Sequence, residues 1–206
     1  MTTLFLIRHA QSMANEEGRI QGWLDSPLSE LGRQQAQALA ERFRSIRLHA
    51  VYSSPLSRAR DTAQAIAHLQ KLPVLLDERL KEYNMGHWTG LSREEIQALW
   101  PSVNLEADHE LVVPGGESAQ DVRNRVELFL REAMAQGGDQ SLAIVTHSGT
   151  LGMVVCAMLG MPVMRRPPFY FGNASVTEVT YRHDRWRLRR LNDQCHLHPL
   201  ELTGRA

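Results

Sequence analysis

Near its start the chain reads Thr3-Leu-Phe-Leu-Ile-Arg-His-Ala-Gln-Ser12. Residues 4–7 form a short apolar run of strand-forming residues, which is typical of a strand buried on both faces of a parallel sheet. The run ends abruptly in Arg8 and His9, and in open α/β sheets ligands bind just beyond the carboxyl ends of the strands. There the arginine would supply a fixed cation, and the histidine a base or a nucleophile. A surface arginine beside a hydrogen-bonded histidine without a catalytic role explains these two residues equally well.

Strand and helix patterns alternate along the rest of the chain. Further strands are predicted at residues 50–54, 72–76 and 142–145. One helix is predicted at residues 29–44, and a second begins at Pro55 with Ser54 as its N-cap. Further helices are predicted at residues 92–100, 118–136 and 148–164. Residues 12–27 and 77–91 are expected as loops, and 101–116 as an irregular lid or insertion.

The order of these elements predicts the architecture. Residues 176–180 and 185–191 alternate between apolar and polar side chains, which predicts two edge strands of a hairpin around His183 and Asp184. Together the elements predict an α/β fold: a three-layer αβα sandwich with a mostly parallel central sheet. No linker, repeat or low-complexity tract divides the sequence, so we expect a single domain over residues 1–206.

The composition is that of an ordinary globular chain. Of its 206 residues, Lys plus Arg and Asp plus Glu account for 23 each, so we expect no nucleic-acid partner and no membrane partner. Cys156 and Cys195 are too few for a disulfide framework and lack a zinc-binding spacing. The longest uncharged stretch, residues 148–164, is shorter than a membrane span. No signal peptide is visible, so we expect a cytoplasmic protein.

Polar groups follow several of the predicted strands. Arg8 and His9, the turn at residues 53–58, and His147 all lie at strand ends, which share one edge of a parallel sheet. Arg58 would stand in the first turn of a helix, where a cation opposes the helix dipole at a cost of up to about 1 kcal/mol. Helical side chains lean toward the N-terminus, so Arg58 is expected to face the strand ends. The alternative is an exposed arginine tolerated at this small cost.

Two arginines and two histidines at one edge suit a phosphoryl group, because arginine pairs with its oxygens in a bidentate way. No cluster of aspartates suggests a metal cage, so we expect neither a metal nor another cofactor. One histidine would attack phosphorus and the other would stabilise the transferring group. An acid must still protonate the leaving oxygen, and Glu82 in the loop after the third strand is the best candidate. Taken alone, this glutamate is more often a solvated surface charge.

Residues 6–15, Leu-Ile-Arg-His-Ala-Gln-Ser-Met-Ala-Asn, resemble the signature of the histidine phosphatase superfamily, which has the phosphoglycerate-mutase-like fold. Further segments are similar to family blocks and follow the family order: residues 21–29, 53–63, 82–90, 116–118 and 145–149. Together these blocks span nearly the whole chain. Two departures stand out, since Ala10 and Ser148 occupy positions where the family commonly has glycine.

The resemblance implies a role for each matching residue. His9 would be the nucleophile that becomes phosphohistidine, with His147 as the second histidine of the pocket and Glu82 as the proton donor. Residues expected to hold the phosphate are Arg8, Arg58 and Asn15. Residues expected on the substrate side are Gln21, Trp23, Met85 and Ser148.

Within the superfamily, the compact region between Glu82 and residue 116 favours a phosphatase over a mutase, whose insertion there is longer. The segments 173–175 and 191–197 are similar to metal-independent phosphoserine phosphatases, in which the C-terminal segment borders the pocket. By that resemblance His196 is expected to bind substrate and the tail to roof the pocket. Met85 stands where those enzymes look to have a histidine, which weakens the serine assignment. The expected substrate is therefore a small phosphorylated metabolite such as phosphoserine.

Several alternatives stay open at this point. They are an α-ribazole or broad-specificity phosphatase, a cofactor-dependent phosphoglycerate mutase, a binding or regulatory domain with little turnover, and a metallohydrolase that uses His9 and His147 as ligands. The catalytic set is complete, which favours an enzyme over a binding domain. The edge strands at the C-terminal end could pair two subunits, so a homodimer is a further expectation.

Overall fold

The computed structural model describes residues 1–103, 112–135, 137–165 and 167–198. At its centre lies a six-stranded sheet with the strand order β3-β2-β4-β1-β5-β6. The strands are β1 (Thr2–Arg8), β2 (Ala50–Ser53), β3 (Val74–Leu76), β4 (Ser141–Thr146), β5 (Val176–Arg182) and β6 (Arg185–Asp193). The first four are parallel to one another, β5 is antiparallel to β1, and β6 is antiparallel to β5. The predicted mostly parallel sheet is confirmed.

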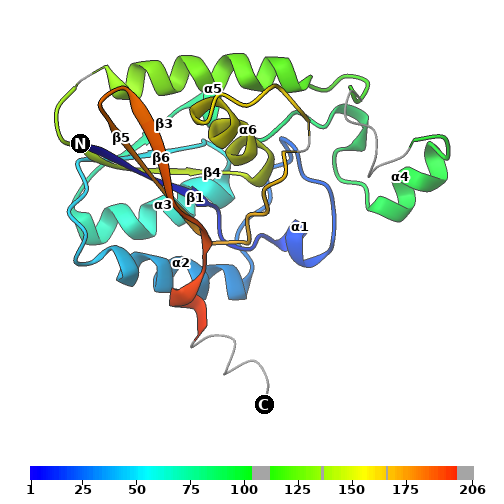
Figure 1. Cartoon of the computed structure of the whole chain (residues 1–206). Coiled ribbons are helices and arrows are strands. Elements are labelled where there is room, and N and C mark those ends of the chain that lie inside the picture. Colours follow the sequence, from blue (N-terminus) through cyan, green and yellow to red (C-terminus); the bar gives the residue numbers. More distant parts are fainter. Residues whose placement is uncertain (104–111, 136, 166, 199–206) are drawn as a thin grey trace.

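Helices cover both faces of this sheet (Figure 1). The α-helices are α1 (Met13–Glu16), α2 (Glu30–Phe43), α3 (Ser57–Gln70), α4 (Arg93–Leu99), α5 (Ala119–Met134) and α6 (Ser148–Met158). Short 3-10 turns are η1 (Glu78–Leu80), η2 (Gly86–Trp88) and η3 (Cys195–Leu197). Helices α2 and α3 pack on one face and α5 and α6 on the other, so the three predicted layers are present.

The position of β1 inside the sheet explains its apolar sequence. Leu4 and Leu6 are buried in the core shared with α5 and α6, whereas Phe5 and Ile7 are buried in the core shared with α2 and α3. Successive side chains of a strand point to opposite faces, so a strand covered on both faces needs an unbroken apolar run. The same division holds for β4. The polar residues within these two strands stand at their ends: Thr2, Thr3 and Arg8 in β1, and Ser141 and Thr146 in β4.

Three predicted helix starts are confirmed by their capping contacts. The Ser29 hydroxyl accepts a hydrogen bond from the backbone N–H of Gly32. Ser92 and Ser118 each form a capping box with the acidic residue three positions on. The start of α3 differs from the prediction: it begins at Ser57, with Leu56 as N-cap and no side-chain cap. Ser54, predicted to cap this helix, instead has its hydroxyl 2.8 Å from Nε2 of His147.

Other element boundaries also differ from prediction. The helix predicted over 148–164 ends at Met158, and Gly160 follows it with a left-handed φ of 66°, a conformation that glycine adopts without strain. Strand β3 covers only the last part of residues 72–76. Helix α1 lies inside the predicted loop 12–27 and starts at a capping box made by Ser12. The irregular segment expected at 101–116 lies in part outside the described residues.

The C-terminal hairpin forms as predicted, with His183 and Asp184 at its turn, both with positive φ. Its two strands are not both edge strands, however, because β5 pairs with β1 on one side and with β6 on the other. Only β6 lies at this edge of the sheet. Within the described ranges, no helix combines the length and apolar character needed to cross a membrane.

Candidate active site

The ends of β1, β2 and β4 bring the first set of polar groups together. The backbone N–H of His9 donates to the carbonyl of Thr146 at 2.9 Å, and that of Ser54 donates to the carbonyl of Val145 at 3.0 Å. These bonds extend the parallel ladders by one residue past each strand. As a result the rings of His9 and His147 lie side by side, with their centroids 5.0 Å apart. The expected meeting of strand ends is present.

His9 is held as a neutral ring with a defined hydrogen position. Its Nδ1 lies 2.7 Å from the carbonyl oxygen of Ala10, and since a carbonyl only accepts, Nδ1 carries the hydrogen. The neutral ring then has its lone pair on Nε2. Burial lowers the pKa of His9 well below its ordinary value, with a further contribution from Arg58 and Arg8. The ring is therefore unprotonated at neutral pH.

Arg58 is almost fully buried and is fixed by two backbone carbonyls. Its Nη1 donates to Leu24 and its Nη2 to Gly22, each at 2.8 Å. Burial lowers the pKa of Arg58 to about 10, an effect that Glu82 and Asp25 oppose. The guanidinium thus stays charged at neutral pH, and it points back toward the strand ends as its place in the first turn of α3 predicts.

Arg8 approaches the same point from β1. Its Nη1 donates to the carbonyl of Phe171 at 2.6 Å, and burial is the main reason why its pKa is lowered. Within the described part of the chain, three buried nitrogen atoms here lack a hydrogen-bond partner: Nε of Arg8, Nε of Arg58 and Nδ1 of His147. Buried polar atoms without partners are rare in folded proteins. Such a group of atoms fits a site built for an anion with several oxygens.

His147 lies beside His9 and is itself fully buried. It is not among the side chains that line the cavity. Burial lowers the pKa of His147 well below its ordinary value, followed in importance by Arg58 and His9. The second histidine is therefore also neutral in the free protein.

The segment just before β5 supports the backbone of His9. The backbone N–H of Ala174 and the side-chain Nδ2 of Asn173 both donate to the His9 carbonyl, at 3.1 Å each. Asn173 also donates to Oδ1 of Asn15. Gln194, just after β6, donates in turn to the carbonyl of Asn173 at 2.9 Å. A residue near the C-terminus thus steadies the loop that holds the first strand end.

Glu82 lies in the loop between η1 and η2, and its carboxylate caps the N-terminus of α6. Oε2 accepts from the backbone N–H of Gly149 at 3.1 Å, and Oε1 accepts from those of Thr150 and Tyr83 at 3.0 Å each. Free N–H groups and the helix dipole both favour an anion at this place. A Cβ atom on Gly149 would lie only 2.7 Å from Oε1. The glycine is thus required by the position of the carboxylate.

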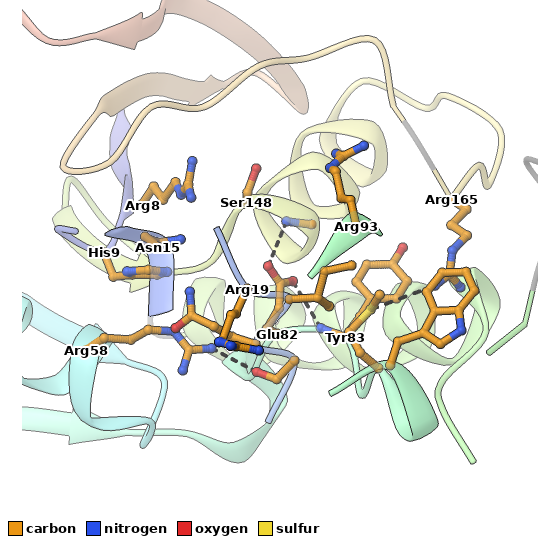
Figure 2. A pocket seen from close by; sticks show the side chains of 16 residues that line it. Arg8, His9, Asn15, Arg19, Arg58, Glu82, Tyr83, Arg93, Ser148 and Arg165 are labelled. Atoms are coloured by element: carbon orange, nitrogen blue, oxygen red, sulfur yellow. Dashed lines mark hydrogen bonds between the residues drawn. The ribbon is translucent and has the colours of Figure 1, made fainter. Parts of the chain in front are cut away.

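These groups border a cavity of about 380 Å³. The predicted residues that line it are Arg8, His9, Asn15, Gln21, Arg58, Glu82, Met85 and Ser148. Figure 2 shows Arg8, His9, Asn15 and Arg58 grouped on one side, with Glu82 beside them and Arg165 toward the other side. A small phosphorylated molecule would fit this space with its phosphate near His9.

Two predicted substrate-binding residues lie elsewhere. Trp23 is 42% exposed and does not line the cavity; its Nε1 donates to the backbone carbonyl of Glu82 at 2.7 Å. His196 has Nδ1 3.2 Å from Arg42 of α2, and burial lowers its pKa to about 4. Its neighbour Leu197 is buried in the core beneath α2 and α3. The prediction that residues 195–197 roof the pocket is therefore wrong, because the burial of Leu197 in this core holds them against α2.

Three arginines of the cavity wall, Arg19, Arg93 and Arg165, were not predicted. Arg165 stacks over the ring of Tyr83 at 5.6 Å, and Arg19 donates to the carbonyl of Gly90 at 2.8 Å. The sequence could have pointed to Arg93, because a cation at the first position of a helix is unfavourable, as it is for Arg58. Arg19 and Arg165 lie outside regular elements and gave no such signal. The wall thus holds five arginines and one carboxylate.

In the described part of the chain, no group of three or more His, Cys, Asp or Glu side chains is placed to hold a metal ion. The positive charge in the wall of the cavity comes from arginine side chains. An αβα fold with an unprotonated histidine beside two arginines at the strand ends is suited to an enzyme that acts on phosphate monoesters.

Comparison with known proteins agrees with this class. A model of the histidine phosphatase superfamily (branch 1) matches residues 4–194. Phosphoserine phosphatase 1 of Hydrogenobacter thermophilus is 36% identical over 200 residues, which cover 96% of this chain and 95% of that protein. "Probable phosphoglycerate mutase GpmB" of Salmonella choleraesuis is 32% identical over 192 residues, or 90% of this chain and 88% of that protein.

A solved structure extends the likeness to three dimensions. A mycobacterial glucosyl-3-phosphoglycerate phosphatase, in complex with VO3, has a TM-score of 0.88 at 35% identity and covers 94% of this chain and 100% of that chain. The chain belongs to the histidine phosphatase superfamily. The resemblance seen in its sequence motifs is thereby confirmed.

Proposed function

We propose that this enzyme hydrolyses small phosphate monoesters in two steps through a phosphohistidine at His9. Nε2 of His9 attacks phosphorus, forming an N–P bond while the P–O bond to the leaving alcohol breaks, and protonated Glu82 gives its proton to that oxygen. Water then attacks phosphorus, the N–P bond breaks, and a proton returns to Glu82. The products are the alcohol and inorganic phosphate. The hydrogen bond from His9 to Ala10, which leaves Nε2 with its lone pair, carries this proposal.

The remaining groups have separate roles in this scheme. Arg8, Arg58 and Asn15 hold the phosphoryl oxygens, and His147, whose ring packs against that of His9, supports the transferring group from the second row of side chains. Glu82 accepts hydrogen bonds from the backbone N–H groups of Tyr83, Gly149 and Thr150, which fix its carboxylate at the wall of the cavity, where the leaving oxygen of the substrate would lie.

The substrate itself is proposed to carry a second acidic group. Arg19, Arg93 and Arg165 line the cavity in addition to the two phosphate-binding arginines, and one phosphate does not use five guanidinium groups. The relatives named above act on or are named for phosphoserine, phosphoglycerate and glucosyl-3-phosphoglycerate, all of which carry a carboxylate beside the phosphate. A small phosphorylated acid of this kind, phosphoserine included, is the proposed substrate class. Cytoplasmic location, homodimer formation and the lack of a nucleic-acid partner stay predictions.

The covalent step is tested by rapid quench. Brief incubation with 32P-labelled substrate should leave acid-labile, base-stable phosphate on the wild-type protein and none on a His9→Ala variant. Labelling of the variant at the wild-type level would reject His9 as the nucleophile. Label that passes to an acceptor alcohol in preference to water would instead indicate the mutase activity named for one relative.

The substrate class is tested with a panel of alkyl phosphates that differ in their second charge. Phosphoserine and 3-phosphoglycerate should have a kcat/KM at least about tenfold above that of glycerol 3-phosphate, since each charge-assisted contact contributes on the order of 1.5 kcal/mol or more. In an Arg93→Met variant this preference should shrink. Equal kcat/KM values for all three compounds in the wild type would show that the extra arginines do not select substrate.

A further inference from the structure

Glu82 lies in a loop without regular secondary structure, and side chains from two other segments hold its backbone. The carbonyl oxygen of Glu82 accepts one hydrogen bond from Nη2 of Arg125 at 3.0 Å and another from Nε1 of Trp23 at 2.7 Å. Arg125 belongs to α5, whereas Trp23 lies between α1 and α2. The residue that must meet the leaving oxygen is thus fastened at its main chain as well as at its carboxylate.

Arg125 contacts more than one point of this loop. Its Nη1 donates to the carbonyl of Arg79 at 2.6 Å, so the same guanidinium binds the main chain at both ends of residues 79–82. Its Nε and Nη2 donate to Oε1 and Oε2 of Glu117, at 2.9 and 3.1 Å. All three nitrogen atoms of the planar fork are used. A lysine ammonium, a single point charge, cannot make this set of contacts.

Glu117 binds the same loop at Asn84, two residues after Glu82 in the sequence. Its Oε2 accepts from the backbone N–H of Asn84 at 2.8 Å, and its own N–H donates to the Asn84 carbonyl at 3.0 Å. The side chains of Arg125 and Glu117 are only 15% and 18% exposed. Together the two residues bind the loop at positions 79, 82 and 84.

A mostly buried ion pair is weak evidence for stability, because its desolvation cost offsets most of the attraction. The contribution of this ion pair is to fix the position of the loop that carries Glu82. An acid displaced by about 1 Å can lose on the order of 100-fold in rate, and a loop without regular hydrogen bonds does not fix its side chains to that tolerance.

We propose that Arg125 and Glu117 are positioning residues that hold Glu82 at the distance from the cavity that proton donation requires. This inference rests on the proposed function only in giving Glu82 the role of acid. It predicts a particular defect: loss of the pair should slow the step in which a poor leaving group departs, whereas aryl phosphates, whose leaving groups need little protonation, should be spared.

The test uses Arg125→Lys and Glu117→Gln, each assayed on phosphoserine and on 4-nitrophenyl phosphate. For Arg125→Lys we expect kcat on phosphoserine to fall about 10- to 100-fold and kcat on the aryl ester to fall less than about threefold. Glu117→Gln, which keeps an amide oxygen in place, should show the same selectivity with a smaller loss. The matched control is Arg42→Lys, which perturbs a similarly buried pair with Asp193, 13% and 19% exposed. It should lower Tm without changing the ratio of the two rates.

A double variant separates the positioning role from the role of the acid. In a Glu82→Gln background, Arg125→Lys should cost less than about twofold more, because both changes act through the same side chain. Two results would overturn the proposal. One is that Arg125→Lys lowers kcat in the Glu82→Gln background as much as it does in the wild type. The other is that Arg125→Lys alone lowers kcat equally on both esters. If Glu82→Gln itself slows both esters equally, the acid assignment fails, and the double variant still decides whether Arg125 acts through Glu82.

Discussion

At the scale of single residues, burial decides the chemistry of the site. His9 and His147 are neutral because burial, and then Arg58, lowers the pKa of each well below the ordinary value of 6.5. The cost of charging either ring inside the protein links the stability of the fold to pH.

This link predicts acid sensitivity. In the unfolded chain these histidines titrate near pH 6.5, so below that pH the unfolded state binds more protons than the folded state. The free energy of unfolding should be independent of these groups above about pH 6.5 and should fall below it, by up to about 1.4 kcal/mol per pH unit for each histidine. Urea unfolding between about pH 5 and about pH 8 measures the slope. His147→Gln should flatten it, whereas replacement of the exposed His87 should not; equal slopes in all three proteins would contradict the prediction.

Gly149 provides a second residue-scale prediction. The added methyl group of Gly149→Ala would meet Oε1 of Glu82 at 2.7 Å, so the carboxylate must move. We expect kcat/KM on alkyl phosphates to fall about tenfold or more, although alanine favours the helix by about 1 kcal/mol. Gly152→Ala on the same helix is the control, since the three atoms nearest to its methyl group would belong to the Pro167 ring, the nearest at 3.0 Å, and not to Glu82. Comparable losses in both variants would mean that helix packing, and not Glu82, is responsible.

At the scale of elements, patterns with strong local signals were predictable from the sequence. The apolar run of β1 and the capping residues Ser29, Ser92 and Ser118 follow rules that act within a few residues. Helix α6 was predicted too long, because the apolar pattern continues past the point where Gly160 ends the helix.

The site shows the same division between local and distant causes. His9, Arg8, Arg58 and Glu82 lie in motifs, and they converge as expected. The position of residues 195–197 depends on a contact that is distant in sequence, the burial of Leu197 beside α2. The positions of Arg19 and Arg165 in the cavity wall depend on the paths of the loops that carry them. Neither of these leaves a periodic pattern in the sequence.

The edge strand β6 allows an element-scale prediction. Its exposed arginines include Arg187 and Arg189, and within the described residues neither forms a salt bridge. Like charges along an edge oppose pairing with a second copy of the strand, so a homodimer formed through this edge would have to overcome their repulsion. Arg187→Val should therefore increase self-association in sedimentation velocity, whereas the same change at the exposed helical residue Arg131 should not. A monomer in every case would show that the arginines are not what protects this edge.

At the scale of the whole molecule, the anion site joins all three layers. Arg58 comes from α3 on one face of the sheet, Glu82 contacts α6 on the other, and His9 lies between them at the end of β1. A ligand that bridges these layers should stabilise the folded chain as a unit.

Inorganic phosphate tests this directly. At about 100 times its Kd, phosphate should raise the free energy of unfolding by about 2.7 kcal/mol, seen as an increase in Tm. Arg58→Met should remove the shift, and a strong chelator should leave both the shift and the hydrolysis rate unchanged. Loss of activity on chelation would favour the metallohydrolase alternative over phosphohistidine chemistry.

The contact of Gln194 with Asn173, and of Asn173 with His9, has a consequence for biosynthesis. Translation delivers β1 and His9 before Asn173, Gln194 and strand β5, which pairs with β1. A chain synthesised only as far as α6 therefore contains His9, Arg58 and Glu82 but lacks the contacts that hold the main chain of His9. We expect such a shortened chain to hydrolyse phosphate esters poorly.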